Sequence, residues 1–322
     1  MHSGAYLIVG AGAIGSIIAG HLAKAGLSVS VLARGQRAAD IRQNGIRIRG
    51  LANFDAPVTV FTQPEQIQAV RVLILATKTP GTAELLDTLS SLEVDLVLSI
   101  QNGLMKNALL SATFGPEKLI GALANTSGEL LPTGEVNFTR NVNVLVGEPG
   151  GELSERVQAL ADDLHQAGVK ARAVRNILSL EWSKFVNWVP LMLLAITTRS
   201  ATWKFLSNPH SADLIIQLVR ELARLLDAQN LELIDDATLL PLYTILQSNK
   251  EQAVEAILSS ATHFRQHAPL HRMSALQDLL AGRALELHET LGYAVQRAKA
   301  LNVDTPVLNN FYQLALAVDR SR

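Results

Sequence analysis

The sequence predicts an α/β fold, with a doubly wound parallel-sheet domain at the N-terminus and an all-α domain after it. Three observations lead to this prediction. Residues 5–33 read as strand, glycine-rich turn, helix and strand, which together form a βαβ unit. Apolar strand patterns then alternate with helical patterns as far as residue 178. From residue 180 onward only helical patterns remain, so we expect two domains, residues 1–178 and residues 179–322.

The elements of the first domain follow from their hydrophobic patterns. Short apolar, β-prone runs predict strands at residues 5–9, 28–33, 71–77, 95–100, 121–127, 136–139, 142–146 and 169–174. Helical patterns lie between them at residues 14–25, 83–92 and 152–167. The runs 71–77 and 95–100 are almost continuously apolar, which is typical of strands buried in a parallel sheet.

The second domain shows only helical patterns. They predict helices at residues 181–198, 211–229, 236–247, 250–265, 274–279 and 283–301. Neither a repeat nor a low-complexity linker is present. A helical domain that follows a nucleotide domain commonly supplies part of a ligand cleft, so we expect reactive side chains early in this half.

Composition narrows the classes of function. The chain is 48% hydrophobic and 18% charged, with 28 basic against 29 acidic residues, so no charge imbalance indicates a nucleic-acid or anionic membrane partner. The absence of cysteine excludes disulfides, thiol catalysis and cysteine-built zinc sites, and fits a cytoplasmic location. Residues 6–23 are nearly long enough for a membrane helix, but their glycines and weak flanks disfavour an anchor. A homodimer through the helical half is left open.

The glycine-rich turn between the first strand and helix predicts a dinucleotide site in a Rossmann-type domain. Gly10 permits the tight turn, Gly12 lets a pyrophosphate approach the backbone, and Gly15 lets the helix pack closely on the sheet. Free N–H groups at the helix start then face the phosphate. The cofactor-binding residues expected here are Gly10, Ala11, Gly12, Ala13, Ile14 and Gly15. The alternative is a turn packed for structural reasons alone.

The end of the second strand favours NADP over NAD. An NAD site commonly places Asp or Glu there to bind the ribose 2′-hydroxyl. This chain instead has Arg34 and Arg37, and a guanidinium pairs well with a 2′-phosphate. The alternative is that both arginines are solvated loop charges.

Lys184 and Asn187 are three residues apart near the start of the helical half, so their side chains are expected on one helix face. Aromatic and apolar residues surround Lys184, and desolvation lowers the pKa of a lysine towards values useful in proton transfer. The alternative is a lysine whose stem packs on an ordinary buried helix.

Several motifs together resemble the ketopantoate reductases (2-dehydropantoate 2-reductases). They are GAGAIGS near the N-terminus, LARG after the second strand, ATKT at 76–79, IQNG at 100–103, EWSKFVN at 181–187 and SALQDLLAGRALELH at 274–288. The resemblance spans nearly the whole chain. It implies the NADPH-dependent reduction of a 2-keto acid, 2-dehydropantoate, to pantoate in pantothenate biosynthesis.

The resemblance implies a role for each matching residue on the coenzyme side. The glycines would hold the pyrophosphate and Arg34 the 2′-phosphate of NADP(H). Lys78, in ATKT, would lie near the coenzyme phosphate or ribose. Asn102, in IQNG, would lie where nicotinamide and substrate meet.

On the substrate side, Lys184 matches the catalytic lysine of the family, which stabilises the developing oxyanion and supplies the proton. Ser274 matches a serine that binds the substrate carboxylate. Glu286 matches a glutamate that orients substrate and lysine, although a surface pair with Arg283 would also explain it.

The sequence departs from the family pattern after Lys184. The family asparagine four residues on is Trp188 here, and Asn187 is the residue expected to take over substrate binding. A second family asparagine falls in the apolar stretch 190–193. The substrate is therefore left open towards a bulkier or more apolar 2-keto acid. The competing functions are a hydroxyacid dehydrogenase and a redox-silent NADP-binding module.

His263, His267 and His271 have a spacing that resembles a metal site on a helix. Pro269 interrupts the helix between the last two, and no nearby carboxylate completes a ligand set. No metal is therefore predicted.

Overall fold

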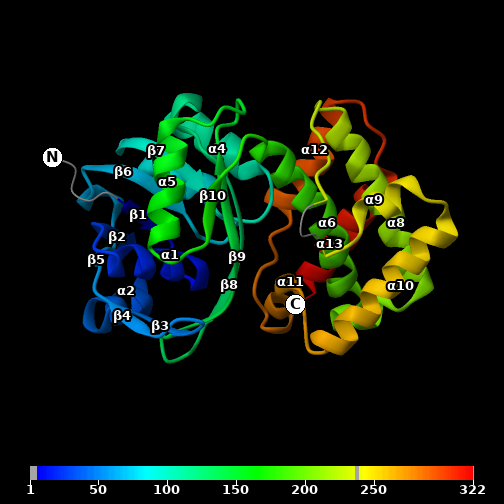
Figure 1. The fold of residues 1–322 in the computed structure, drawn as a ribbon, viewed down its shortest axis with the longest axis horizontal. Coiled ribbons are helices and arrows are strands. Elements are labelled where there is room, and N and C mark those ends of the chain that lie inside the picture. Colours follow the sequence, from blue (N-terminus) through cyan, green and yellow to red (C-terminus); the bar gives the residue numbers. More distant parts are fainter. Residues whose placement is uncertain (1–5, 236–238, 322) are drawn as a thin grey trace. The chain divides into compact units, whose positions relative to one another are not determined.

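The computed structural model describes residues 6–235 and 239–321, and the chain divides into two compact units (Figure 1). The first unit consists of Met1–Asn102 and Lys106–Ile177. The second consists of Gly103–Met105 and Leu178–Arg322, so a three-residue segment of the N-terminal half groups with the helical half. Each unit has its own hydrophobic core.

The first unit is built on a parallel sheet in the order β5-β2-β1-β6-β7. Its strands are β1 (Tyr6–Val9), β2 (Val29–Leu32), β5 (Thr59–Phe61), β6 (Ala69–Leu75) and β7 (Glu93–Ser99). The central strands are rich in Val, Ile and Leu and are buried on both faces, as expected for a parallel sheet between helices.

Helices cover both faces of this sheet. Tyr6 and Ile8 belong to one core cluster with α1 (Ala13–Lys24) and α5 (Glu155–Gln166), while Leu7 and Val9 belong to another. The second cluster contains residues of α3 (Thr82–Leu89) and α4 (Met105–Phe114). Because neighbouring residues of a strand point to opposite faces, the sheet is doubly wound, and the predicted fold class is confirmed.

A second, mixed sheet lies against the other side of α1. Its order is β10-β9-β3-β4, with β8 paired to β9. Its strands are β3 (Ile46–Gly50), β4 (Phe54–Ala56), β8 (Gly121–Leu130), β9 (Val136–Gly147) and β10 (Ala171–Ala173). A Cβ on Gly20 of α1 would lie 3.0 Å from Ile46 and 3.3 Å from Ile48.

Helix α1 is therefore packed between two sheets, which explains its apolar sequence. The ring of His21 makes edge contacts with Phe54 and Phe138, with centroids 4.9 and 5.4 Å apart. Burial on both sides requires apolar residues around the whole helix and not only along one stripe. Among the described residues, no helix is long and apolar enough to span a membrane.

Several elements of the first unit were not predicted. They are α2 (Gly35–Asn44), β3, β4, β5, α4 and the short 3-10 turns Pro64–Gln66 and Pro116–Lys118. The strands are short, and β3 alternates buried Ile46 and Ile48 with partly exposed arginines, because the second sheet is covered on one face. The two strands predicted within 136–146 form the single strand β9, which pairs with β8 through an irregular register near Asn141.

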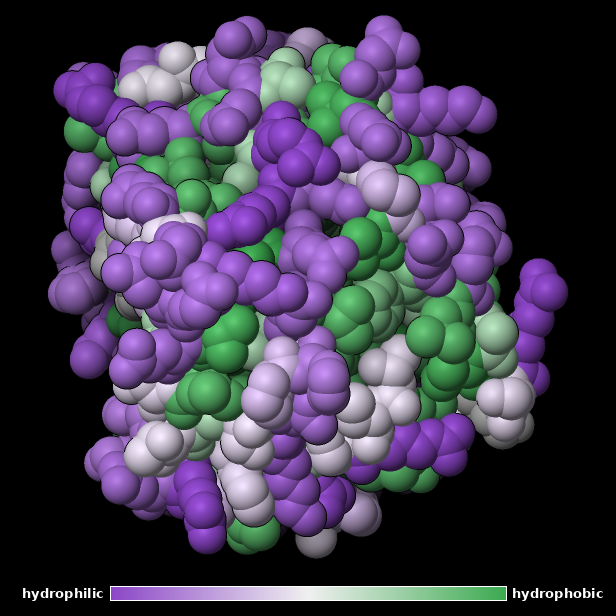
Figure 2. Space-filling view, turned by 90° about the vertical axis from the view of Figure 1, so that its right-hand side faces the viewer, coloured by the Kyte–Doolittle hydropathy of each residue, from purple (hydrophilic) through white to green (hydrophobic). Residues whose placement is uncertain are grey.

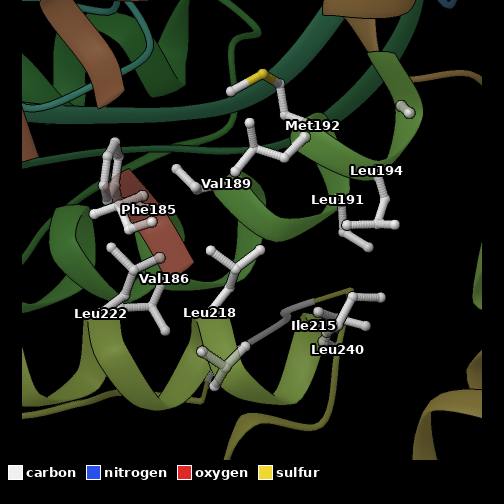
Figure 3. Packing of buried hydrophobic residues seen from close by; sticks show 14 of the residues in the cluster. Phe185, Val186, Val189, Leu191, Met192, Leu194, Ile215, Leu218, Leu222 and Leu240 are labelled. Carbon is white, nitrogen blue, oxygen red and sulfur yellow. The ribbon is translucent and has the colours of Figure 1, made fainter. Parts of the chain in front are cut away.

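The second unit is helical. Its helices are α6 (Ile177–Thr198), α7 (Thr202–Leu206), α8 (Pro209–Asp227), α9 (Leu242–Gln247), α10 (Lys250–His267), α11 (Ser274–Leu280), α12 (Tyr293–Ala300) and α13 (Pro306–Arg320). A π-helical turn, His288–Gly292, precedes α12. Helix α6 runs through the core, where Val186 and Val189 pack near Leu218 and Leu222 of α8 (Figure 3).

Two predictions for the second unit needed correction. The helix predicted at 283–301 begins only at the π-helical turn, since residues 283–287 form no helix and the Leu285 N–H donates to Asp319 Oδ1 at 3.0 Å. The helix predicted at 236–247 starts at Leu242 after Pro241, and residues 236–238 lie outside the described residues. Helices α7 and α13 were not predicted. The buried carboxylate of Glu221 accepts both first-turn N–H groups of α13, from Val307 and Leu308.

The surface of the second unit carries several large apolar side chains. The exposed ones are Tyr243, Leu270, Leu280 and Leu314. On the face shown in Figure 2, hydrophobic residues form separate groups divided by hydrophilic ones. Scattered apolar surface of this kind is ordinary for a folded chain, so the homodimer stays a prediction.

Candidate active site

The glycine turn, residues 10–15, is shaped by close backbone contacts. Gly10 has φ +101°, and a Cβ there would lie 2.7 Å from Thr77 Cγ2 and 2.8 Å from Thr77 N. A Cβ on Gly15 would collide with the carbonyl oxygen of Gly10 and lie 3.0 Å from Ala76 Cβ. Gly10 and Gly15 are therefore required by sterics, before any ligand is considered.

Gly12 differs from these two glycines because its surroundings are open. Apart from Gly12 itself and its two chain neighbours, no described atom lies within 4 Å of the position that a Cβ on Gly12 would take. Gly12 is the N-cap residue of α1, no side chain caps this end in the described part of the chain, and the first turn has no acidic residue. The N-terminus of a 12-residue helix thus presents N–H groups next to an open space. These features fit the pyrophosphate of a dinucleotide.

The two arginines after β2 lie in different environments. Arg34 is exposed and is the N-cap residue of α2. Arg37 is mostly buried and donates hydrogen bonds to protein acceptors, among them the carbonyl of Ala11 at 2.9 Å. Arg34 therefore remains the candidate for a 2′-phosphate, and Arg37 becomes part of the protein framework.

The loops after β1, β6 and β7 leave the same edge of the parallel sheet, because these three strands are neighbours. Buried Gln101 joins two of them. Its Nε2 donates to Thr77 Oγ1 at 3.1 Å, to the Lys78 carbonyl at 3.1 Å and to Thr82 Oγ1 at 2.9 Å. Lys78 is exposed and Asn102 half-buried. The turn and the two predicted coenzyme residues thus belong to one edge of the first unit.

Sequence reasoning missed Gln101 and Lys106. Lys106, in α4, is 5% exposed, and its Nζ donates to the carbonyls of Ser99 at 3.0 Å and Ala122 at 2.5 Å. It thereby links the end of β7 to β8. A lysine in a short helix reads as a surface residue, so the sequence held no signal for this role. For Gln101 the only signal was its place directly before Asn102.

In the second unit, Lys184 lies on α6 and is half-buried. Its neighbours Trp182 and Phe185 are buried, with ring centroids 5.9 Å apart. Trp188 is half-buried one helical turn further on, the spacing at which side chains share a face. The partly desolvated setting predicted for Lys184 is therefore present.

Asn187 has its side chain bound to backbone groups. Its Oδ1 accepts the Leu239 N–H at 3.0 Å, its Nδ2 donates to the Leu240 carbonyl at 3.2 Å, and the residue is 4% exposed. Ser183 and Ser179, one and two turns earlier, accept the N–H groups of Ile234 and Glu232. These three polar residues form a stripe that binds backbone groups of residues 232, 234, 239 and 240. The hydrogen bonds indicate a structural role for Asn187, and its expected role in substrate binding stays a prediction.

Ser274 lies at the start of α11, and Glu286 lies six residues beyond its end. Ser274 is its exposed first residue, and Glu286 is half-buried before the π-helical turn. Thr290 Oγ1 donates to the Glu286 carbonyl. Gly103, with φ +84°, packs on the same turn, where a Cβ would lie 2.7 Å from Thr290 Cγ2. π-helical turns are frequent at functional sites.

The three histidines considered for a metal are placed separately. The rings of His263 and His267 stack at 4.4 Å at the end of α10, whereas His271 Nδ1 is 2.8 Å from Thr202 Oγ1. Within residues 6–235 and 239–321, no group of three His, Asp or Glu residues could hold a metal ion.

Comparison with known proteins identifies the family. The family model described as ketopantoate reductase PanE/ApbA matches residues 6–151, and the model of its C-terminal part matches residues 176–319. A 2-dehydropantoate 2-reductase of Archaeoglobus fulgidus is 24% identical over 315 residues, which cover 97% of each chain.

Solved structures share the fold of the whole chain. A ketopantoate reductase from Ralstonia eutropha has a TM-score of 0.82 at 20% identity, covering 98% of this chain and 99% of that one. A D-mandelate dehydrogenase with NADH and anilino(oxo)acetate has a TM-score of 0.81 at 20% identity, with the same coverage. With both family models matched across the two units, the chain belongs to the ketopantoate reductase family of oxidoreductases.

Proposed function

We propose that this protein reduces a 2-keto acid with NADPH, with 2-dehydropantoate as the first candidate substrate and pantoate as the product. The observation that carries the proposal is the family match over residues 6–151 and 176–319, which includes every predicted site residue. The domain boundaries of the proposal are those expected from the sequence, residues 1–178 for the coenzyme and 179–322 for the substrate.

The coenzyme side of the proposal rests on the open end of α1. The N–H groups beside Gly12 would bind the pyrophosphate, since this helix end faces open space. Arg34, exposed at the start of α2, would pair with the 2′-phosphate, and a guanidinium is suited to that geometry. Lys78 would lie near the phosphate or ribose, and Asn102 near the nicotinamide. The proposed preference is therefore for NADP(H), in contrast to the NADH in the mandelate dehydrogenase structure.

The chemical side of the proposal rests on Lys184. The coenzyme, when bound, supplies a hydride to the keto carbon of the substrate. The Lys184 ammonium stabilises the negative charge that grows on the keto oxygen and then gives that oxygen a proton, which leaves a 2-hydroxy acid. Glu286 would keep Lys184 charged and oriented, and Ser274 would bind the substrate carboxylate.

A second candidate substrate is an aromatic 2-keto acid. The observation that favours it is Trp188, which is half-buried one turn from Lys184 where the family has an asparagine. Residues 191–193 are core residues, so Trp188 is the departure that bears on the substrate. An indole adds apolar surface and removes an amide donor, which favours a ring over a small hydroxylated substrate. The mandelate dehydrogenase neighbour holds such an aromatic compound.

The test follows NADPH consumption by the purified protein with ketopantoate and, separately, with phenylglyoxylate. We expect turnover that falls about 1,000-fold in Lys184→Ala, since a positioned proton donor contributes roughly 10²–10⁴-fold. The matched control is Lys299→Ala, which removes an exposed lysine of α12 and is expected to leave turnover unchanged. Faster reduction of phenylglyoxylate would favour the second candidate. Coenzyme binding without reduction of either acid would contradict the proposal and favour a redox-silent NADP-binding module.

A further inference from the structure

We propose that Arg37 is a positioning residue of the coenzyme site, which orients the peptide group in front of the phosphate-binding helix end without contacting the coenzyme itself. The inference rests on the proposed NADP(H) binding. From the sequence alone, Arg37 is only a second candidate for the 2′-phosphate.

One side of the Arg37 guanidinium holds the glycine turn. Its Nε donates to the Ala11 carbonyl at 2.9 Å, and an Nη donates to Ser16 Oγ at 2.8 Å. Ser16 Oγ in turn donates to the same Ala11 carbonyl at 3.1 Å. The three groups form a closed set of hydrogen bonds, and the one carbonyl oxygen of Ala11 receives two donors.

The other side of the guanidinium is anchored to the framework. An Nη donates to Asp40 Oδ2 at 2.9 Å and to the Gly134 carbonyl at 2.7 Å, in the turn between β8 and β9. Gly134 has φ +83° and packs directly over the Asp40 carboxylate, where a side chain would not fit. The opposite oxygen of Asp40 accepts Arg47 at 3.0 Å. A planar guanidinium fixed from two sides is a rigid bridge between this turn and the glycine turn.

The direction of the Ala11 carbonyl determines the direction of the next N–H group. The peptide bond is planar and trans, so the C=O of Ala11 and the N–H of Gly12 point in opposite directions. Arg37 and Ser16 draw the carbonyl towards the protein, and the Gly12 N–H is therefore directed away from them. Open space surrounds Gly12, which is where the proposed pyrophosphate would accept that N–H.

This geometry separates Arg37 from Arg34. The guanidinium of Arg37 donates to acceptors on Ala11, Ser16, Asp40 and Gly134, whereas Arg34 is exposed at the N-cap of α2. Arg37 should then affect every coenzyme with a pyrophosphate to the same degree. Arg34 should affect only a coenzyme with a 2′-phosphate.

The experiment measures dissociation constants of NADPH and NADH by nicotinamide fluorescence, for wild type and for three variants. Arg37→Ala is expected to weaken both coenzymes by the same factor, about tenfold, the scale of one charge-assisted hydrogen bond. Arg34→Ala is expected to weaken NADPH alone. Arg47→Ala is the matched control, because Arg47 shares Asp40 and the β8–β9 turn with Arg37 but binds no atom of the glycine turn, and both constants should stay unchanged.

A second measurement follows hydrogen exchange of the coenzyme-free protein. Arg37→Ala should raise the exchange rate of backbone amides in residues 10–16. The melting temperature of Arg37→Ala should stay close to that of Arg47→Ala. Arg37→Lys, which keeps the charge, should behave like Arg37→Ala, because one ammonium cannot reach these separate acceptors. If Arg37→Ala does not fold, Arg37→Lys and Ser16→Ala carry the test, and Ser16→Ala should weaken both coenzymes about threefold.

Three results would overturn the inference. Arg37→Ala could weaken NADPH alone, which would make Arg37 a ligand of the 2′-phosphate. Arg37→Ala could leave both dissociation constants unchanged. Arg37→Lys could retain full affinity, which would make the charge of Arg37, and not its geometry, the cause. A wild-type protein that binds neither coenzyme would overturn the proposed function as well, so the two failures are distinguishable.

Discussion

The glycine turn of the first unit and the first half of α6 in the second unit are both candidate ligand sites, but they are built in different ways. The glycine turn is specified largely by its own residues, since Gly10 has φ +101° and a Cβ on Gly15 would meet the Gly10 carbonyl oxygen. The face of α6 that holds Asn187 is specified by a segment far along the chain, around Leu240. Local sterics can be read from a sequence, whereas the partner of a buried amide cannot.

The largest effect expected from this comparison is on the glycine turn. Gly15→Ala places a methyl group against the Gly10 carbonyl and should lower the free energy of unfolding by about 3 kcal/mol, the upper range for overpacking. The methyl group of Gly12→Ala points into open space, and this variant should change the free energy of unfolding by less than about 0.5 kcal/mol. Urea unfolding of both variants measures the difference.

Coenzyme affinity then separates the two glycines further. Gly12→Ala should fold normally and still bind NADPH at least tenfold more weakly, because its methyl group occupies the space proposed for the pyrophosphate. Equal stability losses in the two variants, or full affinity in Gly12→Ala, would contradict the assignment of different roles to Gly12 and Gly15.

A smaller effect is expected for Asn187. Asn187→Ala leaves the Leu239 N–H and the Leu240 carbonyl without this partner and should lower the free energy of unfolding by about 2 kcal/mol. If this structural role is its main one, its KM for the 2-keto acid should stay close to the wild-type value, because both polar atoms of the amide bind backbone groups. Ser183→Ala is a matched variant from the same stripe, with an expected loss of about 1 kcal/mol. A KM raised tenfold with unchanged stability would restore Asn187 as a substrate residue.

The smallest effect expected is the pH dependence contributed by His21 in α1. Burial lowers the pKa of His21 below its ordinary value of 6.5, so the folded protein favours the neutral ring. The unfolded chain takes up a proton as the pH falls through about 6.5, while the folded protein resists it. The stabilising contribution is thus complete above that pH and is lost progressively below it.

Urea unfolding between about pH 7.5 and about pH 5.5 tests this dependence. His21→Leu should lose less stability over that interval than the wild type. His210→Leu, which removes an exposed histidine of α8, should follow the wild type. If the stability of the wild type falls no faster over this interval than that of His21→Leu, burial of His21 contributes nothing to acid sensitivity.

The sequence was sufficient for the fold class and for the glycine turn, because both depend on local patterns. Alternation of apolar runs and helical patterns predicted the doubly wound sheet, and the helical half was recognised from the same periodicity. The short strands β3, β4 and β5 escaped detection, since three to five residues give little periodic signal. The π-helical turn before α12 was read as ordinary helix, because its sequence differs little from one.

The framework of the candidate site could not be predicted for a different reason. Arg37 binds Gly134, which is 97 residues away, and Asn187 binds Leu240, which is 53 residues away. Lys106 is buried against two carbonyls, although its sequence environment suggests a surface residue. In each case the role depends on which distant backbone groups the fold brings near, and a single sequence does not record that.

The fate of the hydride tests the proposed reduction most directly. The protein would be incubated with ketopantoate and NADPH deuterated at both C4 positions, and the product analysed by mass spectrometry and NMR. We predict a 2-hydroxy acid that carries deuterium on C2, formed much more slowly by Lys184→Ala. If wild type binds NADPH and forms no labelled hydroxy acid from ketopantoate or phenylglyoxylate, the proposed reduction is contradicted.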